Sequence, residues 1–253
     1  MATTTLSITG KGGTGKSTVA GLLIRALKEK KAGSILAVDG DPNSTLPEIL
    51  GVENPDTIVG IVDGIVSYKL TVPAGMTKDR FVDLKIQESL AEEDGFDLLV
   101  MGRPEGSGCY CYANNLLRGL IERLTKSYDF VVIDNEAGME HISRRTTKVA
   151  DRLLLVSDYS AFGIRSAGRI YRLAQDIGMK IGKASLIINR ADGDAGIFED
   201  EIRATKLPLI GVIPQSEDIV SNSVQGKTIF ELKSEKIDET IEGILNKILE
   251  VPA

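Results

Sequence analysis

The sequence is poor in the residues that build disulfide frameworks and histidine metal sites. Its 253 residues include two cysteines, one histidine and no tryptophan. The two cysteines, Cys109 and Cys111, are too few and too close for a structural disulfide framework. No apolar run reaches the roughly 18 residues that span a bilayer, and the first residues lack the features of a secretory signal. We therefore expect a cytoplasmic protein without membrane attachment.

An excess of basic residues is also missing. The formal net charge of -6 argues against broad nucleic-acid binding, which needs a basic face. Arg144, Arg145 and Lys148 form one small basic cluster, which we interpret as a solvated helix face. We expect no nucleic-acid partner. The chain is 42% apolar and 26% charged, as is usual for a globular domain with a sizeable core.

Short runs of β-branched and aliphatic residues alternate with segments of helix length. Runs such as "FVVID" and "SLIIN" are almost continuously apolar, which is typical of strands covered on both faces. The alternation predicts one domain over residues 1–253: a doubly wound, mainly parallel α/β sheet of about seven or eight strands, with helices on both faces. The predicted strands are Thr4–Thr9, Ser34–Asp39, Asp97–Met101, Phe130–Asp134, Arg152–Ser157, Ala184–Asn189 and Leu209–Ile213. The predicted helices are Lys16–Lys30, Lys78–Glu92, Tyr112–Lys126, Ile142–Ala150, Phe162–Ile177 and Ile197–Ala204.

Two segments need separate treatment. Gly51–Gly75 has scattered glycine and proline and no clear period, so it is either a helical excursion or a mobile lid. Ile237–Val251 places apolar residues on one helical stripe. Its polar face is mainly acidic, whereas helices that lie on membranes usually carry a basic face. We therefore expect this helix to pack on the core.

The segment "GKGGTGKS", residues 10–17, matches the phosphate-binding pattern G-x-x-x-x-G-K-[ST] between a predicted strand and a predicted helix. Its glycines let backbone amides wrap phosphates, and the following helix points its positive end at the same anion. Lys16 should reach the β and γ phosphates, and the Ser17 hydroxyl should complete a magnesium shell. The predicted nucleotide-binding residues of this loop are Gly12, Gly13, Thr14, Gly15, Lys16, Ser17 and Thr18.

Two strand-ending segments carry carboxylates. In "AVDGDPNSTL", Asp39 ends a predicted strand and is a candidate turn residue before Gly40. In "FVVIDNEAGMEH", four apolar residues precede Asp134. Burying a carboxylate at that strand end without a cation would be costly, so we expect Asp134 to hold magnesium through water.

The two cysteines follow a predicted strand and precede a predicted helix. Thiolates favour soft or borderline metals such as Ni²⁺, Zn²⁺ or iron–sulfur clusters. Two thiols are half of a tetrahedral site, and a symmetric dimer could supply four. The start of a helix stabilises thiolates, which favours metal binding by Cys109 and Cys111. The alternative is a reduced, buried pair that packs like small apolar residues.

The string "KGGTGKST" resembles the deviant Walker A motif of the MinD, ParA, ArsA and nitrogenase iron-protein class of P-loop ATPases. The resemblance implies that Lys11 reaches across a dimer interface to the partner's nucleotide. It also implies that Asp41 positions or activates the attacking water, and that Gly138 senses the γ phosphate. Asp39 would then lie near the outer shell of the magnesium ion, as the alternative to a turn residue. The catalytic residues would then be Lys11, Lys16 and Asp41.

The same resemblance places an adenine pocket at the ends of two later strands. Asn189 would contact the base, with the backbone of Pro214 and Gln215 alongside. No guanine-reading N-K-x-D follows the earlier of these strands, where "NRAD" stands instead. Asp192 occupies the place of that motif's aspartate, so a distant GTPase variant stays open. The resemblance favours ATP.

The combination of "GKGGTGKST", "VDGDP", the C-x-C pair and "DNEAGMEHISRR" resembles the CooC-type nickel-insertion ATPases, which mature carbon monoxide dehydrogenase, and the related acetyl-CoA synthase maturation ATPases. It implies a homodimer that uses ATP and Mg²⁺, holds Ni²⁺ (or Zn²⁺) between subunits and delivers nickel to one of those client enzymes. His141 would be either a nickel ligand or a hydrogen-bonded switch residue. Thr14 and Ser17 depart mildly from the usual Val and Thr, and the match fades over Gly51–Gly95.

Two other functions use the same loop. A MinD- or ParA-like positioning switch would need a basic tail or face, which the sequence lacks. An electron-transfer ATPase with a bridging [4Fe–4S] cluster would use the same cysteines, but the second switch carries His141 where that class has a cysteine.

Overall fold

A computed structural model describes residues 3–66, 71–103, 123, 126–136 and 149–249. Within these residues one eight-stranded sheet has the order β3-β4-β2-β5-β1-β6-β7-β8. All neighbouring strands are parallel except β3, which pairs antiparallel with β4 at one edge. The predicted fold class is confirmed. The strands are β1 Thr4–Gly10, β2 Ile35–Gly40, β3 Ala91–Glu93, β4 Phe96–Val100, β5 Phe130–Asn135, β6 Val149–Asp158, β7 Lys180–Ala191 and β8 Leu209–Pro214.

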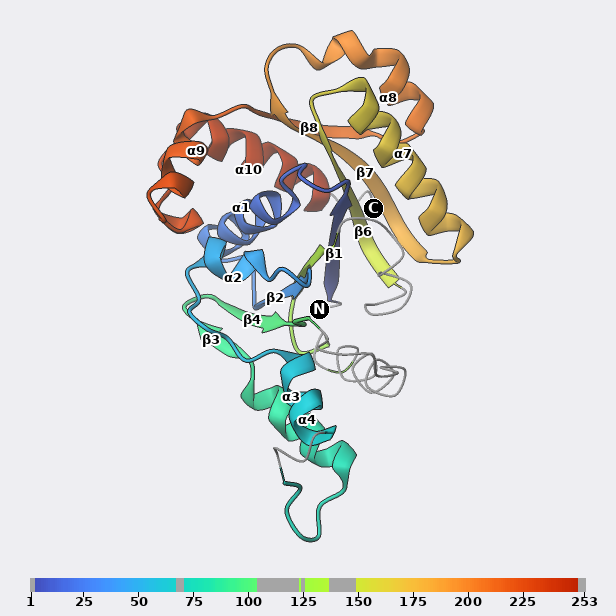
Figure 1. Cartoon of the computed structure of the whole chain (residues 1–253). Coiled ribbons are helices and arrows are strands. Elements are labelled where there is room, and N and C mark those ends of the chain that lie inside the picture. The colour runs from blue at the N-terminus through green and yellow to red at the C-terminus, as the bar shows by residue number, and fades with distance from the viewer. Residues whose placement is uncertain (1–2, 67–70, 104–122, 124–125, 137–148, 250–253) are drawn as a thin grey trace.

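Helices cover both faces of the sheet, with α1 and α10 on one face and α7 on the other (Figure 1). The α3–α4 pair extends away from the β3–β4 edge. The α-helices are α1 Lys16–Glu29, α2 Thr45–Leu50, α3 Ile58–Val66, α4 Lys78–Glu88, α7 Ala161–Asp176, α8 Glu199–Thr205, α9 Glu217–Val224 and α10 Glu235–Leu249. Two short 3₁₀ helices, η1 Ala195–Phe198 and η2 Ile229–Glu231, complete the described elements.

Strand β2 shows why the apolar runs are continuous. Ile35 and Ala37 pack into the core that contains α1 and α10, whereas Leu36 and Val38 pack into the core that contains α3 and α4. Successive side chains of a strand point to opposite faces, so a strand between two helical layers must be apolar at every position. A third core joins β6 and β7 to α7.

The C-terminal helix packs on the core, as predicted. Its apolar stripe is buried against the same face as α1. Arg25 of α1, itself buried, donates to the carbonyls of Ile229 and Leu232 and pairs with Asp238 at the start of α10. Among the described residues, no helix has both the length and the apolar character needed to cross a bilayer.

The predicted helix Lys78–Glu92 is wrong at its C-terminal end. Helix α4 stops at Glu88, and Ser89 caps it by donating its N–H to Lys85 and its hydroxyl to Ile86. The chain then forms β3 and turns through Asp94–Gly95 into β4, with Gly95 at φ 82°. A two-residue Asp-Gly connection is a strong hairpin signal, and it was available in the sequence.

Other predictions need smaller corrections. The segment Gly51–Gly75 contains helix α3, which favours the helical excursion over the lid. The predicted helix Ile142–Ala150 is wrong at its last two residues, because β6 begins at Val149. Helices α2 and α9 were not predicted. Several predicted features lie outside the described residues: the rest of Ile142–Ala150, most of Tyr112–Lys126, and Cys109, Cys111, Gly138 and His141.

Candidate functional site

The phosphate loop (Gly10–Ser17) joins the end of β1 to the start of α1, at the carboxyl edge of the sheet. Three of its glycines occupy positions that are unfavourable for other residues. A Cβ on Gly10 would lie 2.2 Å from the carbonyl oxygen of Val156 on the neighbouring strand. Gly13 and Gly15 have φ values of 80° and 84°, which L side chains rarely adopt. The local shape therefore depends on glycine, as the motif predicts.

The start of α1 is suited to an anion. No acidic residue stands in its first turn, so its positive end is not neutralised from within the helix. Lys16 is buried at the first helical position, and Ser17 and Thr18 are half-buried beside it. Lys11 is exposed at the other end of the loop. The two lysines thus differ in environment: one serves the enclosed side of the loop, and the other faces outward.

Asp134 lies on β5, next to the loop, in register with Ile8 of β1. Its side chain is fully buried, and neither carboxylate oxygen has a hydrogen-bond partner among the described residues. Burial raises the pKa of Asp134 to about 7; the nearby Ser17 hydroxyl and Lys16 oppose this rise, although Ser17 forms no hydrogen bond of ordinary geometry with either oxygen. A buried, unpartnered carboxylate beside a hydroxyl is an oxygen donor set that fits Mg²⁺.

Asp39, at the end of β2, differs from Asp134 because its carboxylate has hydrogen-bond partners. Its two carboxylate oxygens accept the backbone N–H groups of Asp41 at 2.9 Å and of Leu46 at 3.0 Å. Burial raises its pKa to about 6, against the effect of these two hydrogen bonds. Asp39 was predicted either to lie near the magnesium ion or to stabilise a turn. These hydrogen bonds favour the second role, because they stabilise the turn that leads from β2 into α2.

Asp41 lies in that turn and is half-buried. One of its oxygens, Oδ1, accepts both the backbone N–H and the side-chain amide of Asn43, each at 2.9 Å. The carboxylate is therefore held through one oxygen by a single neighbouring residue. Asn43 was not among the predicted site residues, although an Asp-x-Asn sequence is a common signal for such a turn.

The residues predicted to contact a base lie together. Asn189, Pro214 and Gln215 line one cavity of about 370 Å³ with Thr18, Arg190, Ser216 and residues of α9. The Gln215 N–H donates to the Ala191 carbonyl at 2.8 Å, which joins the ends of β7 and β8. Helix α9 forms one wall of this cavity. The Ser216 hydroxyl caps α9, and the acidic residues Glu217 and Asp218 follow it in the first turn. This pattern is a common signal for the start of a helix, so the sequence could have predicted α9.

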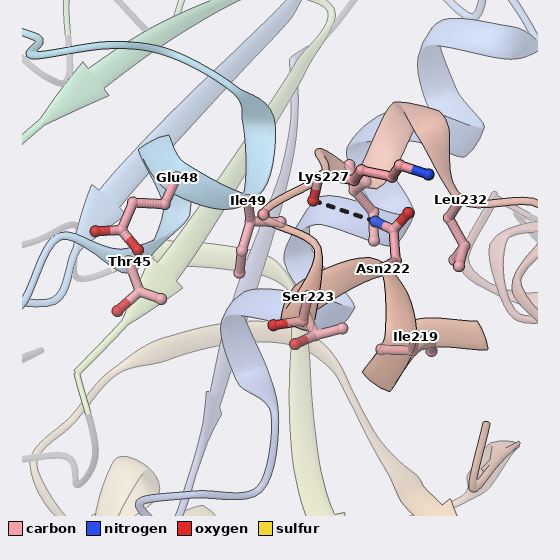
Figure 2. Close-up of a pocket in the computed structure, with 11 residues that line it drawn as sticks. Thr45, Glu48, Ile49, Ile219, Asn222, Ser223, Lys227 and Leu232 are labelled. Carbon is pink, nitrogen blue, oxygen red and sulfur yellow. Dashed lines mark hydrogen bonds between the residues drawn. The ribbon is translucent and has the colours of Figure 1, made fainter. Parts of the chain in front are cut away.

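A second cavity, of about 310 Å³, lies between α2, α9 and η2 (Figure 2). Its wall includes a hydrogen bond from the side-chain amide of Asn222 to the Lys227 carbonyl at 3.2 Å. Thr18, Ile219 and Ser223 line both cavities. The two cavities therefore adjoin at α9 and the first turn of α1, which brings α2 close to the predicted base pocket.

Comparisons with known proteins agree with this geometry. Residues 6–229 match the family model of the CobQ/CobB/MinD/ParA nucleotide binding domain. An uncharacterized ATP-binding protein of Methanocaldococcus jannaschii is 42% identical over an alignment that covers 96% of this chain and 98% of that protein. The carbon monoxide dehydrogenase accessory protein CooC of Rhodospirillum rubrum is 33% identical, with 90% of this chain and 89% of CooC covered.

Solved structures show the same fold. The MinD cell division protein of Aquifex aeolicus superposes with a TM-score of 0.72 at 22% identity, covering 99% of this chain and 98% of MinD. The septum site-determining protein MinD of Pyrococcus horikoshii, in complex with Mg-ADP, gives a TM-score of 0.70 at 20% identity, covering 98% and 96%. At these identities the likeness concerns the fold.

Proposed function

The chain belongs to the CobQ/CobB/MinD/ParA nucleotide-binding family, and from that premise we propose that it is a magnesium-dependent ATPase switch that dimerises with ATP. One observation carries the proposal: the buried carboxylate of Asp134, without a hydrogen-bond partner among the described residues, lies beside a loop built to hold phosphates. An uncompensated buried charge is costly, and bound magnesium with a triphosphate would remove that cost.

The loop residues would share the binding of the nucleotide. Backbone amides of Gly12–Ser17 and the Lys16 ammonium would hold the phosphates. The Ser17 hydroxyl, with Asp134 acting through water, would hold the magnesium ion, which supplies positive charge against the phosphates. Asn189 and the Pro214–Gln215 backbone would bind the base in the 370 Å³ cavity, and we propose adenine as that base.

Hydrolysis would depend on Asp41. A water oxygen attacks the γ phosphorus, and the bond to the bridging oxygen breaks to leave ADP. Asn43 occupies Oδ1 of Asp41, which leaves Oδ2 to accept a hydrogen bond from that water. Lys16 stabilises the charge that develops on the transferred phosphoryl group. Gly138, outside the described residues, remains the predicted sensor of the γ phosphate.

A dimer would complete the site. The exposed position of Lys11 suits a side chain that reaches the partner subunit's nucleotide. ATP then favours the closed dimer because its γ phosphate binds more tightly to that state than to the open one. Hydrolysis removes this difference and allows the dimer to open.

The finer part of the proposal concerns cargo and client. We propose that Cys109 and Cys111 of two subunits form a four-thiolate site that carries Ni²⁺, or Zn²⁺ in the same ligands. The client would be carbon monoxide dehydrogenase or acetyl-CoA synthase. The identity of 33% with CooC across almost the whole chain supports this part. The packing of α10 on the core gives no support to the rival membrane-positioning switch.

Anaerobic metal-binding stoichiometry, measured with and without Mg-ATP alongside molecular mass, tests both parts. We expect one Ni²⁺ per dimer, more tightly held with ATP, and loss of that metal in Cys109→Ala. Ser107→Ala is the matched control and should keep the metal. Unchanged metal content in Cys109→Ala would discard the cargo site and leave the ATPase proposal standing. A wild-type protein without affinity for Mg-ATP would overturn the whole proposal.

A further inference from the structure

Strand β7 is irregular where it approaches the phosphate loop. The regular pairing of β7 with β8 is interrupted between Ile188 and Ala191, which leaves Asn189 and Arg190 in a bulge. Arg190 has φ 56°, in the left-handed region that arginine rarely adopts. Bulges next to functional sites commonly re-aim side chains. The bulge therefore sets the direction of both side chains.

Both of them contact the phosphate loop. The Asn189 side-chain amide donates to the Thr14 carbonyl at 2.8 Å, and the Arg190 guanidinium donates to the Gly13 carbonyl at 3.1 Å. The approach is close enough that a Cβ on Gly15 would lie 2.3 Å from the Asn189 amide nitrogen. Two successive carbonyls of the loop are thus held from outside by two successive residues of one strand end.

Holding a carbonyl also orients an amide. In a trans peptide the C=O and the N–H point in opposite directions. A donor on the Gly13 carbonyl therefore fixes the direction of the Thr14 N–H, and a donor on the Thr14 carbonyl fixes that of the Gly15 N–H. The Thr14 N–H meets the Lys11 carbonyl only at 3.5 Å, a weak contact that a phosphate oxygen can replace.

The two residues are placed differently with respect to solvent. Asn189 is 5% exposed and also lines the base cavity, so its replacement would disturb the base and the loop together. Arg190 lines the same cavity, but it is exposed, and its guanidinium donates to the loop. Replacing Arg190 therefore disturbs the protein less, and a ligand without a base separates its effect on the loop from any effect on the base pocket.

We propose that Arg190 is a positioning residue of the phosphate loop. It holds the Gly13–Thr14 peptide in the orientation that presents amides to a polyphosphate. Together with Asn189 it joins the loop to the base pocket in one hydrogen-bonded unit. This inference rests on the proposed nucleotide binding, and it assigns to Arg190 a role that acts through the loop.

The test compares the Kd for Mg-ATP, by calorimetry, with the inhibition constant of tripolyphosphate against ATP hydrolysis. For Arg190→Ala we expect both constants to rise about three- to tenfold, the worth of one charge-assisted hydrogen bond at a partly solvated site. KM should rise while kcat stays near the wild-type value, because the lost interaction serves binding. Arg190→Lys, which keeps one cationic donor, should recover most of the loss.

Two further variants separate this role from other effects. Glycine adopts the left-handed backbone of position 190 without strain. Arg190→Gly should therefore show the same rise in both constants as Arg190→Ala, with an unchanged melting temperature. Arg169→Ala removes an exposed arginine from α7 and is the matched control for charge. It should leave both constants unchanged.

Three results would overturn the inference. A rise for ATP with none for tripolyphosphate would mean that Arg190 acts on the base. An equal loss in Arg169→Ala would mean that only net charge matters. Unchanged constants in both Arg190→Ala and Arg190→Gly would mean that the loop needs no such support. Failure of the proposed function is distinct, because it would already be visible as absent Mg-ATP binding in the wild-type protein.

Discussion

Asp39 and Asp134 are register partners on the neighbouring parallel strands β2 and β5, and both side chains are fully buried. Asp39 accepts two backbone amides, whereas Asp134 has no hydrogen-bond partner among the described residues. Burial raises the pKa of Asp39 to about 6 and that of Asp134 to about 7, from the usual value of 3.8. The folded protein therefore binds protons on these groups more tightly than the unfolded chain does.

The sign of the pH dependence follows from those two values. Between about pH 4 and pH 7 the unfolded chain has lost these protons while the folded protein still holds them. Without magnesium and nucleotide, the contribution of these two groups to the free energy of unfolding is therefore full below about pH 4 and falls as the pH rises through about 6 and 7. The charged groups acting on Asp134 are Asp39, Asp41 and Lys16.

Asp134→Asn should remove most of that pH dependence. We expect the variant to be more stable than wild type at pH 8 without nucleotide by about 1–3 kcal/mol, because about 1.4 kcal/mol accompanies each pKa unit and the buried amide offsets part of the gain. Magnesium-dependent ATP binding should be lost. Denaturant unfolding at pH 5 and pH 8 in chelator measures the first effect. Asp192→Asn, at an exposed position, is the control and should keep the wild-type pH dependence. If the stability of Asp134→Asn changed between pH 5 and pH 8 as much as that of the wild type, the raised pKa of Asp134 would be contradicted.

Lys11→Ala should separate dimerisation from binding. Lys11 is exposed in the phosphate loop, whereas Lys16, at the end of the loop where α1 begins, is buried. We expect the variant to keep Mg-ATP affinity within about threefold of wild type, because Lys16 and the loop amides remain. ATP-driven dimerisation should be lost. Light scattering with and without Mg-ATP measures this, with exposed Lys183→Ala on the amino half of β7 as control. Normal dimerisation of Lys11→Ala would rule out the cross-subunit role.

Asn43→Ala should lower turnover without weakening substrate binding. The side-chain amide of Asn43 is one of two donors that hold Oδ1 of Asp41. Its loss leaves only the backbone N–H of residue 43 on Oδ1, so the carboxylate is held less firmly toward the attacking water, and we expect kcat to fall about three- to tenfold with KM unchanged. Asn246→Ala, on the exposed face of α10, is the control in a steady-state ATPase assay. A change in KM alone would show that Asn43 serves binding.

Gly10→Ala and Gly243→Ala should have opposite effects on stability. A Cβ on Gly10 would meet the Val156 carbonyl oxygen at 2.2 Å, and a backbone atom there cannot move aside cheaply. We expect a loss of about 1–3 kcal/mol in the free energy of unfolding. A Cβ on Gly243 of α10 meets nothing within 4 Å, so alanine should raise stability by about 0.5–1 kcal/mol. Guanidinium unfolding of both variants gives the comparison; equal changes would refute the steric account of Gly10.

The sheet and the phosphate loop could be predicted because their causes lie in short stretches of sequence. Apolar runs mark strands covered on both faces, and Leu36 and Ala37 pack into opposite cores as such a run requires. The loop pattern places glycine at Gly13 and Gly15, where the backbone is left-handed. Both features depend on the local chemistry of neighbouring residues. The edge strand β3 escaped prediction because three residues give too short a pattern against a preceding helical period.

By itself, the sequence determined the main strands and helices and their order, the loop between β1 and α1, and the carboxylates at the ends of β2 and β5. Tertiary structure alone decided which of these groups meet. In the folded chain, the carboxylate oxygens of Asp39 accept backbone N–H groups from residues up to seven positions away, whereas those of Asp134 have no hydrogen-bond partner among the described residues. The tertiary structure also brought Asn189 and Arg190 to a loop more than 170 residues earlier. The physical reason is that hydrogen bonding and burial depend on distance in space, which strand register and helix packing set, whereas a sequence pattern reports only separation along the chain.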